Sequence, residues 1–290
     1  MMKKLSIFTI LLLLSFSALS QKTDKKLKKQ IETIIIGFNG EVGVYVKDLK
    51  TNKVVSINAD TIFPTASMIK IPILIGVMDK IHRGELDYHQ NLEYRDSLLY
   101  AGVDILGSFR DSQKIELSKA MMLMLTMSDN TASLWLQYLA GTGTRINQIL
   151  DSLGFSFTRI NSRTPGRELN RTQYGWGQTT PREMAGLMEK IINGEIISKE
   201  KSGWMLRMLG RNYWDENAIS QIPPDVFVAS KNGAVNQVRN EVVFVSGRGA
   251  RYIFCICTKN NKDVSWKSEN EAWVMTRKLS KLLFEKYEDD

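Results

Sequence analysis

Strand-forming patterns stand at both ends of this 290-residue sequence, and helix-forming patterns fill its middle. Residues 42–46 and 54–57 are rich in β-branched side chains and are separated by turn residues, which is typical of a hairpin. Three more strand patterns lie at residues 225–229, 241–246 and 251–258. Strands so far apart in the sequence can share one hydrophobic core only if they pair with one another in a sheet. We therefore expect an α/β (α+β) fold with one antiparallel sheet built from both chain ends.

Helical periodicity marks the segments between these strands, and an amphipathic pattern over residues 271–284 predicts a terminal helix against the sheet. Residues 161–179 lack apolar periodicity and contain Pro165 and several glycines, which predicts a surface loop. The predicted middle helices cover residues 67–84, 115–127, 131–139, 181–192 and 201–209.

A single two-lobed domain accommodates these elements, and the 43% hydrophobic content suffices for its core. We expect the sheet lobe at about residues 30–62 and 195–290, and an inserted all-helical lobe at about residues 63–194.

The first twenty residues have the pattern of an export signal. Lys3 and Lys4 precede an apolar run over residues 5–16, and small residues at positions 17–20 suit cleavage before Gln21. We expect a mature domain of residues 21–290 in the periplasm or outside the cell. Retention of the segment as an anchor is the alternative. No later stretch has the pattern of a membrane span.

Charge and cysteine content narrow the classes of partner. The formal net charge of +8 comes partly from the signal and from a lysine-rich run over residues 22–29, and no arginine stripe with interleaved aromatics predicts nucleic-acid binding. Cys255 and Cys257 alternate on one strand pattern, so we expect buried free thiols.

Two cysteines and two histidines are too few for a metal site, and no phosphate-binding glycine loop occurs. We expect no cofactor, a small-molecule substrate and a monomer.

The stretch from Phe63 to Lys70, followed by an apolar run over residues 71–78, carries the first chemical signal. A proline and a threonine before periodic apolar residues predict a helix start, which places Ser67 in the first turn and Lys70 one turn later on the same face. A serine hydroxyl needs a nearby base to attack a carbonyl group. A lysine beside a helix N-terminus, whose field disfavours the ammonium form, suits that role.

The Ser-x-x-Lys spacing alone is weak, because Ser198 to Lys201 repeats it in a charged stretch that has the pattern of a solvated turn. Two further triplets follow the first copy in the chain. Ser128-Asp129-Asn130 precedes an apolar helix, where a plain N-cap is the competing interpretation, and Lys231-Asn232-Gly233 stands at a strand start.

With these three elements in order, the sequence resembles the class A β-lactamases and penicillin-binding proteins. The separations, 128 − 67 = 61 and 231 − 128 = 103 residues, are similar to those of class A enzymes. The resemblance covers almost the whole mature chain. It implies that Ser67 is the acylated nucleophile, that Lys70 is its base or proton relay, and that Ser128 carries a proton to the leaving nitrogen.

The resemblance also implies the binding residues. Asn130 would hold Lys70 and a substrate amide, and Lys231 would supply positive potential to a substrate carboxylate and to Ser128. The oxyanion hole would be the backbone N–H groups of Ser67 and Ala234. The remaining residues that the resemblance assigns to the substrate are Asn170, Asn232 and Gly233.

Two departures from the family pattern concern the chemistry. The Glu168-Leu169-Asn170 run aligns with the family's Glu-Leu-Asn and puts Gly166 where the water-activating glutamate belongs. Glu168 is the alternative base if the loop threads differently, and otherwise a loop carboxylate. Asn232 replaces a threonine or serine that binds the substrate carboxylate. Arg239 either supplies a compensating charge or is a solvated strand residue.

Three functional hypotheses follow. The first is a secreted class A type β-lactamase, acylated at Ser67 and slow to deacylate, since losing a general base costs about a hundredfold to ten-thousandfold in rate. The second is a peptidase, transpeptidase or esterase that acts on cell-wall peptides or small esters. The third is a silent binding or scaffold protein.

Overall fold

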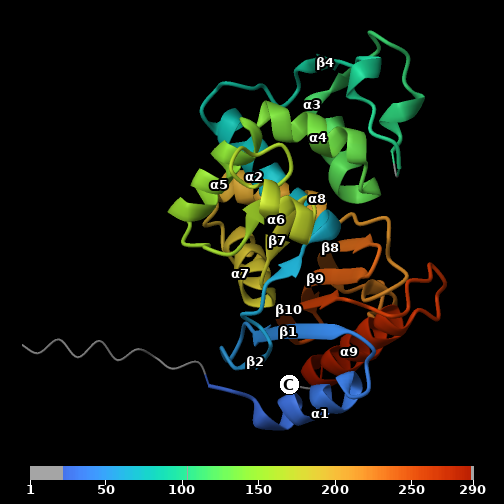
Figure 1. Ribbon diagram of the computed structural model, residues 1–290. Helices are drawn as coiled ribbons and strands as arrows, with labels where there is room; N and C mark the ends of the chain where they lie inside the picture. Colours follow the sequence, from blue (N-terminus) through green and yellow to red (C-terminus); the bar gives the residue numbers. More distant parts are fainter. Residues whose placement is uncertain (1–21, 103, 289–290) are drawn as a thin grey trace, which may run out of the picture.

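The computed structural model describes residues 22–102 and 104–288, and within them a five-stranded antiparallel sheet has the order β2-β1-β10-β9-β8 (Figure 1). The first two strands come from the beginning of the chain and the other three from its end, so the predicted pairing of both chain ends is confirmed. The strands are β1 (Glu41–Asp48), β2 (Val54–Ile57), β8 (Phe227–Val235), β9 (Val238–Gly247) and β10 (Ala250–Lys259).

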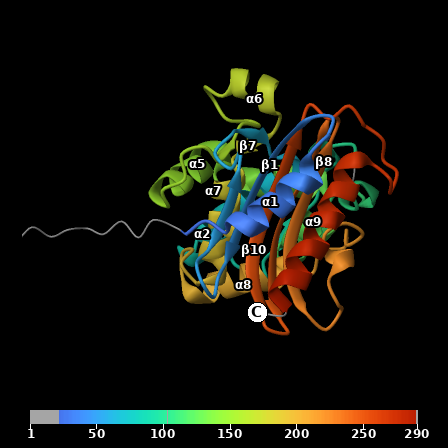
Figure 2. The same ribbon diagram turned by 90° about the horizontal axis from the view of Figure 1, so that it is seen from below.

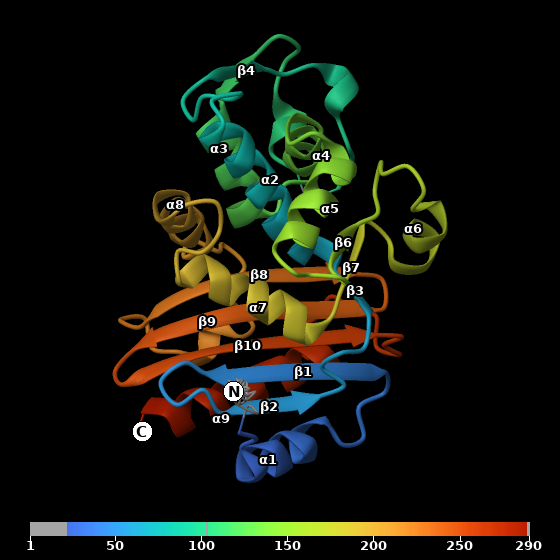
Figure 3. The same cartoon turned by 90° about the vertical axis from the view of Figure 1, so that its left-hand side faces the viewer.

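Helices cover both faces of this sheet (Figures 2 and 3). On one face, α1 (Lys25–Ile35) and α9 (Glu271–Glu288) bury an apolar cluster that includes Leu27, Val44 and Leu279. On the other face, α7 (Pro181–Ile192) lies against β1 and β10 and joins the larger core that it shares with the helices above. The Thr180 side chain caps α7 with Pro181 at its first position, as the sequence predicts.

The upper lobe is organised around α2 (Lys70–His82), whose residues from Lys70 to Met78 are all buried (Figure 3). A helix that is apolar all round belongs inside a bundle, and α4, α5 and α8 surround it. The helices of this region are α3 (Leu117–Met122), α4 (Asn130–Leu139), α5 (Thr142–Ser152), α6 (Glu168–Tyr174) and α8 (Lys199–Leu209). Its short strands are β3 (Phe63–Pro64), β4 (Asn91–Glu93), β5 (Lys114–Glu116), β6 (Arg159–Ile160) and β7 (Gly177–Thr179).

Several local predictions were wrong. The segment 115–127 begins as β5 and ends in a π-helical turn, Leu123–Met127. No helix is predicted from the sequence at α5, and α6 falls within a predicted loop because it buries no side chain and so has no apolar periodicity. The second Ser-x-x-Lys copy is no solvated turn, since Ser198 caps α8 and Lys201 is buried with its ammonium 3.7 Å from the Trp204 ring centre.

Cys255 and Cys257 are buried free thiols, as predicted, with their sulfur atoms 3.7 Å apart. No helix between residues 22 and 288 is long and apolar enough to cross a bilayer. The predicted signal segment lies outside the described residues.

Candidate active site

Ser67 lies in a 3-10 turn, η1 (Ala66–Ile69), that leads directly into α2. Its predecessor Ala66 has a φ of +46°, a conformation that an L-residue adopts only when its surroundings impose it. The turn that carries Ser67 is therefore a 3-10 turn, which is tighter than the α-helical turn predicted from the sequence. The Nζ atom of Lys70 lies 3.2 Å from the Ser67 Oγ.

Lys70 is fully buried and surrounded by oxygen atoms. Its Nζ lies 2.6 Å from the Ser128 backbone oxygen, 3.0 Å from the Ser128 Oγ and 3.0 Å from the Asn130 Oδ1. Burial lowers the pKa of Lys70 well below its ordinary value, the positive charge of Lys231 lowers it further, and Asp129 opposes both. A neutral amine at this distance is able to accept the Ser67 proton. Burial, rather than the helix field expected from the sequence, is the main cause.

Ser128 owes its position to an irregular backbone. It follows the π-helical turn Leu123–Met127 and has a left-handed conformation, with φ of +60°. The next residue, Asp129, caps α4 by accepting from the Ala132 N–H at 2.7 Å, and it also accepts from the N–H groups of Ile105 and Leu106. The N-cap interpretation of this triplet is therefore correct for Asp129, while Ser128 and Asn130 face Lys70.

The strand β8 passes unusually close to η1, and Gly233 makes this approach possible. A Cβ atom on Gly233 would lie 2.6 Å from the Thr65 carbonyl oxygen and 2.7 Å from the Ser67 nitrogen. The Ser67 backbone N–H and the strand segment that carries Ala234 are thereby brought to one place. Both Ser67 and Ala234 line the same pocket.

Lys231 is fully buried on β8 and donates to the Asn232 carbonyl oxygen at 2.9 Å and to the Asn232 Oδ1 at 3.0 Å. Among the described residues it makes no hydrogen bond to Ser128. Burial lowers the pKa of Lys231 to about 7, and the negative charge of Glu241 partly offsets this. Because the Asn232 oxygen is turned to Lys231, its amide N–H groups are left for the pocket.

Glu241 on β9 is a buried carboxyl group that the sequence reading did not single out. Its oxygens accept from the Ser230 Oγ at 3.1 Å and from the Ala218 N–H at 3.2 Å. Burial raises the pKa of Glu241 to about 7, although these two hydrogen bonds and Lys231 favour the charged form. Alternation along the strand gave no signal for it, because a strand covered on both faces need not show alternation.

The loop that contains α6 holds Glu168 and Asn170 away from Ser67. Glu168 is exposed, and its carboxylate accepts from the Gly166 backbone N–H at 3.1 Å. Asn170 donates to the Gln178 side chain at 3.1 Å. Neither residue lines the pocket at Ser67, nor does Gly166, whose φ is +78°.

Arg239 does not reach the pocket either. Its side chain is 1% exposed, and its guanidinium donates to the backbone oxygens of Asn236, Val238, Val264 and Ser265. The same guanidinium lies 4.5 Å from the Trp266 ring centre and 5.0 Å from that of Trp273. It is thus neither a solvated strand residue nor a charge presented to a ligand.

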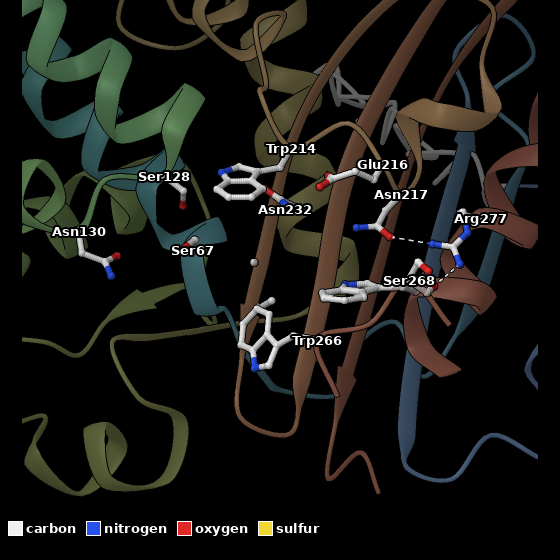
Figure 4. A pocket seen from close by; sticks show the side chains of 13 residues that line it. Ser67, Ser128, Asn130, Trp214, Glu216, Asn217, Asn232, Trp266, Ser268 and Arg277 are labelled. Atoms are coloured by element: carbon white, nitrogen blue, oxygen red, sulfur yellow. Dashed lines mark hydrogen bonds between the residues drawn. The ribbon is translucent and has the colours of Figure 1, made fainter. Parts of the chain in front are cut away.

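A pocket of about 630 Å³ extends from Ser67 past β8 toward α9 (Figure 4). The motif residues lining it are Ser67, Ser128, Asn130, Asn232, Gly233 and Ala234, which the structure brings together as predicted. Sequence reasoning missed the rest, namely Trp214, Glu216, Asn217, Trp266, Ser268, Trp273 and Arg277. The one available signal was a pair of tryptophans, Trp214 and Trp266, inside otherwise polar loop segments.

The model of the beta-lactamase enzyme family matches residues 26–287 of this sequence. The chain belongs to the beta-lactamase enzyme family. Beta-lactamase VEB-1 from Pseudomonas aeruginosa is 24% identical over 235 residues, or 78% of each chain. The structure of PBP-A matches the structure of this chain with a TM-score of 0.82 at 23% sequence identity. The match covers 93% of this chain and 98% of the PBP-A chain.

A PBP-A variant solved as an acyl-enzyme complex with penicillin-G has the same TM-score, at 24% identity, with 93% of this chain and 99% of that chain covered. These likenesses confirm the predicted fold and the resemblance to class A β-lactamases and penicillin-binding proteins.

Proposed function

We propose that this protein is a serine hydrolase of the class A β-lactamase type that opens the β-lactam amide by forming an acyl-enzyme at Ser67. The observation that carries the proposal is the 3.2 Å contact between the Lys70 Nζ and the Ser67 Oγ, made by a lysine whose burial favours the neutral amine. That contact supplies the base that a serine nucleophile requires.

The proposed acylation balances as follows. Lys70 takes the Ser67 proton while the Ser67 Oγ bonds to the carbonyl carbon, and the backbone N–H groups of Ser67 and Ala234 stabilise the oxyanion. The C–N bond then breaks, the Ser128 hydroxyl gives its proton to the leaving nitrogen, and Lys70, with its Nζ 3.0 Å from the Ser128 Oγ, returns to Ser128 the proton that it took from Ser67. Asn130 and the Asn232 amide orient the substrate.

Deacylation is proposed to be slow. A rapid class A enzyme needs a carboxylate that activates water on the side of the α6 loop, and here Glu168 is exposed and bonded to its own loop. Glu216 is the one carboxylate among the described pocket-lining residues, and it lies beyond β8 from Ser67 (Figure 4). A missing general base costs about a hundredfold to ten-thousandfold.

A cell-wall peptidase or transpeptidase is the second candidate. The same missing base favours it, because an acyl-enzyme that excludes water persists until an amine acceptor arrives. The PBP-A variant captured as an acyl-enzyme with penicillin-G shows that a protein of this fold forms such an adduct. Both functions act outside the cytoplasm, which agrees with the proposed export signal in residues 1–20. We also propose that the protein acts as a monomer.

Intact-mass measurement on the mature protein tests these functions. The protein is mixed with a penicillin and with a chromogenic cephalosporin, and colour and mass are followed together. We expect one adduct per chain, lost in Ser67→Ala, with turnover slower than adduct formation. Rapid turnover would contradict slow deacylation. An adduct that is released only when an amino-acid acceptor is added would favour the transpeptidase. If neither compound forms an adduct, the result would favour the hypothesis of a silent binding or scaffold protein.

A further inference from the structure

The half of the pocket that lies beyond β8 takes no part in the acylation steps described above. Three tryptophans line it, Trp214, Trp266 and Trp273, and we refer to this half as the tryptophan trough. Figure 4 shows Trp214 and Trp266 on opposite sides of the route that leads from Ser67 toward Arg277. An apolar wall of this kind, opening directly from a nucleophile, belongs to ligand recognition more than to core packing.

Trp214 fixes which part of a substrate enters the trough. Its indole N–H donates to the Met127 backbone oxygen at 3.0 Å, and Met127 directly precedes Ser128. The trough therefore opens on the Ser128 side of Ser67. In the proposed function the Ser128 hydroxyl protonates the leaving atom, so the trough receives the leaving group and not the acyl group.

Trp266 is held in place although it is 66% exposed. Arg239 lies behind its ring, with the guanidinium carbon 4.5 Å from the ring centre. The Asp263 carboxylate accepts from the N–H groups of Ser265 and Glu271, and hydrogen bonds to the Ser265 side chain and then to these N–H groups hold the pKa of Asp263 at about 2. Such a loop presents a large apolar ring to solvent at no further cost in ordering, which is the condition for tight ligand contact.

The charges around the trough indicate what the ligand carries. Glu216 makes no hydrogen bond or ion pair with any described residue, while Arg277 donates to the Asn217 Oδ1 at 3.2 Å and to the Ser268 carbonyl oxygen. One carboxylate and one guanidinium give the far end no net charge, so it offers no net electrostatic attraction to a ligand charge of either sign. Indole faces attract a flat ring with polarised C–H edges.

We propose that the tryptophan trough is a leaving-group subsite that binds a flat, uncharged aromatic ring carried by the leaving-group portion of the substrate. This inference rests on the proposed acyl-enzyme function. It adds a specificity determinant to it, with Trp266 as the open platform and Trp214 as the opposite wall.

A matched pair of cephalosporins tests the subsite. The two compounds share their acyl side chain and carboxylate and differ only in the substituent on the six-membered ring, an uncharged aryl-vinyl group in one and a methyl group in the other. The second-order rate constant of Ser67 acylation is measured for the wild type, Trp266→Ala, Trp266→Phe and a remote control, Tyr138→Ala, whose ring is 69% exposed on α4.

We expect Trp266→Ala to lower acylation by the aryl compound roughly tenfold and by the methyl compound less than about twofold. Trp266→Phe should recover most of the difference, and Tyr138→Ala should change neither rate. Equal losses for both compounds in Trp266→Ala would overturn the subsite, because they would mean that Trp266 only supports the fold of the site.

The same pair separates failure of the subsite from failure of the acylation. If neither compound acylates the wild type, the proposed function fails, and the subsite is judged from dissociation constants of both compounds for Ser67→Ala with and without Trp266→Ala. The subsite is supported if Ser67→Ala binds the aryl compound more tightly than the methyl compound and the double variant does not. The subsite is overturned if Ser67→Ala binds both compounds equally well. Displacement of the aryl compound by a neutral disaccharide at lower concentration than by an aromatic amide would overturn the aromatic assignment.

Discussion

Gly233 lies so close to Ser67 that a Cβ atom on the glycine would be 2.7 Å from the Ser67 backbone nitrogen. The contact joins the last strand of the sheet to the turn that carries the nucleophile. It sets the separation between the two backbone N–H groups proposed to form the oxyanion hole, because Ala234 is the next residue along β8.

Gly233→Ala is therefore expected to separate β8 from η1. We expect the acylation rate to fall by about a hundredfold or more, the usual cost of losing one oxyanion donor, and the free energy of unfolding to fall by about 1–3 kcal/mol. Gly203→Ala is the matched control, since a Cβ there meets nothing within 4 Å, and it should stabilise α8 by about 0.5–1 kcal/mol. Normal acylation in Gly233→Ala would contradict this placement of the oxyanion hole.

Lys70→Ala should lower acylation of Ser67 by about a hundredfold to ten-thousandfold, because it removes the proposed base, whose Nζ lies 3.2 Å from the Ser67 Oγ. Intact mass after timed mixing with penicillin measures this. Lys201→Ala, in the second Ser-x-x-Lys copy, should leave the rate unchanged because its ammonium contacts the Trp204 ring and the Glu200 carboxylate and does not line the pocket at Ser67. A comparable loss in both variants would indicate misfolding rather than chemistry.

Acylation by an anionic β-lactam should depend on the charge of Lys231. The pKa of this lysine is about 7, so its positive charge is present below that pH and is lost as pH rises through it. We expect the second-order rate constant to fall severalfold between about pH 6 and 9. Glu241→Gln removes the negative charge that supports protonated Lys231 and should move this fall to lower pH. An uncharged ester substrate should not show it.

Glu241 also predicts a pH dependence of stability. Its folded pKa of about 7 exceeds the ordinary value of 4.5, so the folded protein binds more protons than the unfolded chain between these values. The contribution of this group to stability is therefore lost as pH rises from about 4.5 to 7. Relative to the wild type, Glu241→Gln should become more stable across that interval in urea denaturation. A constant difference would contradict the raised pKa.

Glu168→Gln should leave deacylation within about twofold of the wild-type rate, because the side chain is exposed and bonded to the Gly166 N–H. The rate is read from the decay of the acyl-enzyme mass after excess penicillin is removed. A loss of a hundredfold would instead show that the α6 loop closes over the acyl group and that Glu168 replaces the missing base.

Arg239→Met should destabilise the fold, because four backbone carbonyl oxygens lose the donor of a buried guanidinium. The expected loss in unfolding free energy is about 1.5–3 kcal/mol, measured by urea denaturation. Arg248→Met removes a guanidinium of the same size from exposed pairs with Asp225 and Glu288 and should cost less than about 1 kcal/mol. Equal costs would mean that the carbonyl contacts of Arg239 contribute little.

The structure could be predicted from the sequence wherever local chemistry decides the backbone conformation. Thr180 and Pro181 begin α7 as predicted, and the three motifs carry their order and residue types within short segments. Prediction from the sequence failed where segments that are distant in the chain contact one another. The side chain of Arg239 is buried by carbonyls of residues 264 and 265, and Trp214 and Trp266 are brought to one pocket by loops with no periodicity, so no local pattern predicts either. Likewise α6 buries no side chain, and the left-handed conformation of Ser128 follows a π-helical turn that has no local sequence signature.

The hydrogen bond from the Trp214 indole to the Met127 carbonyl oxygen joins the loop that follows α8 to the backbone that precedes Ser128. A substrate that pushes the Trp214 ring aside is therefore expected to disturb the backbone that carries the Ser128 hydroxyl. Recognition of the leaving group and delivery of its proton are then coupled rather than independent.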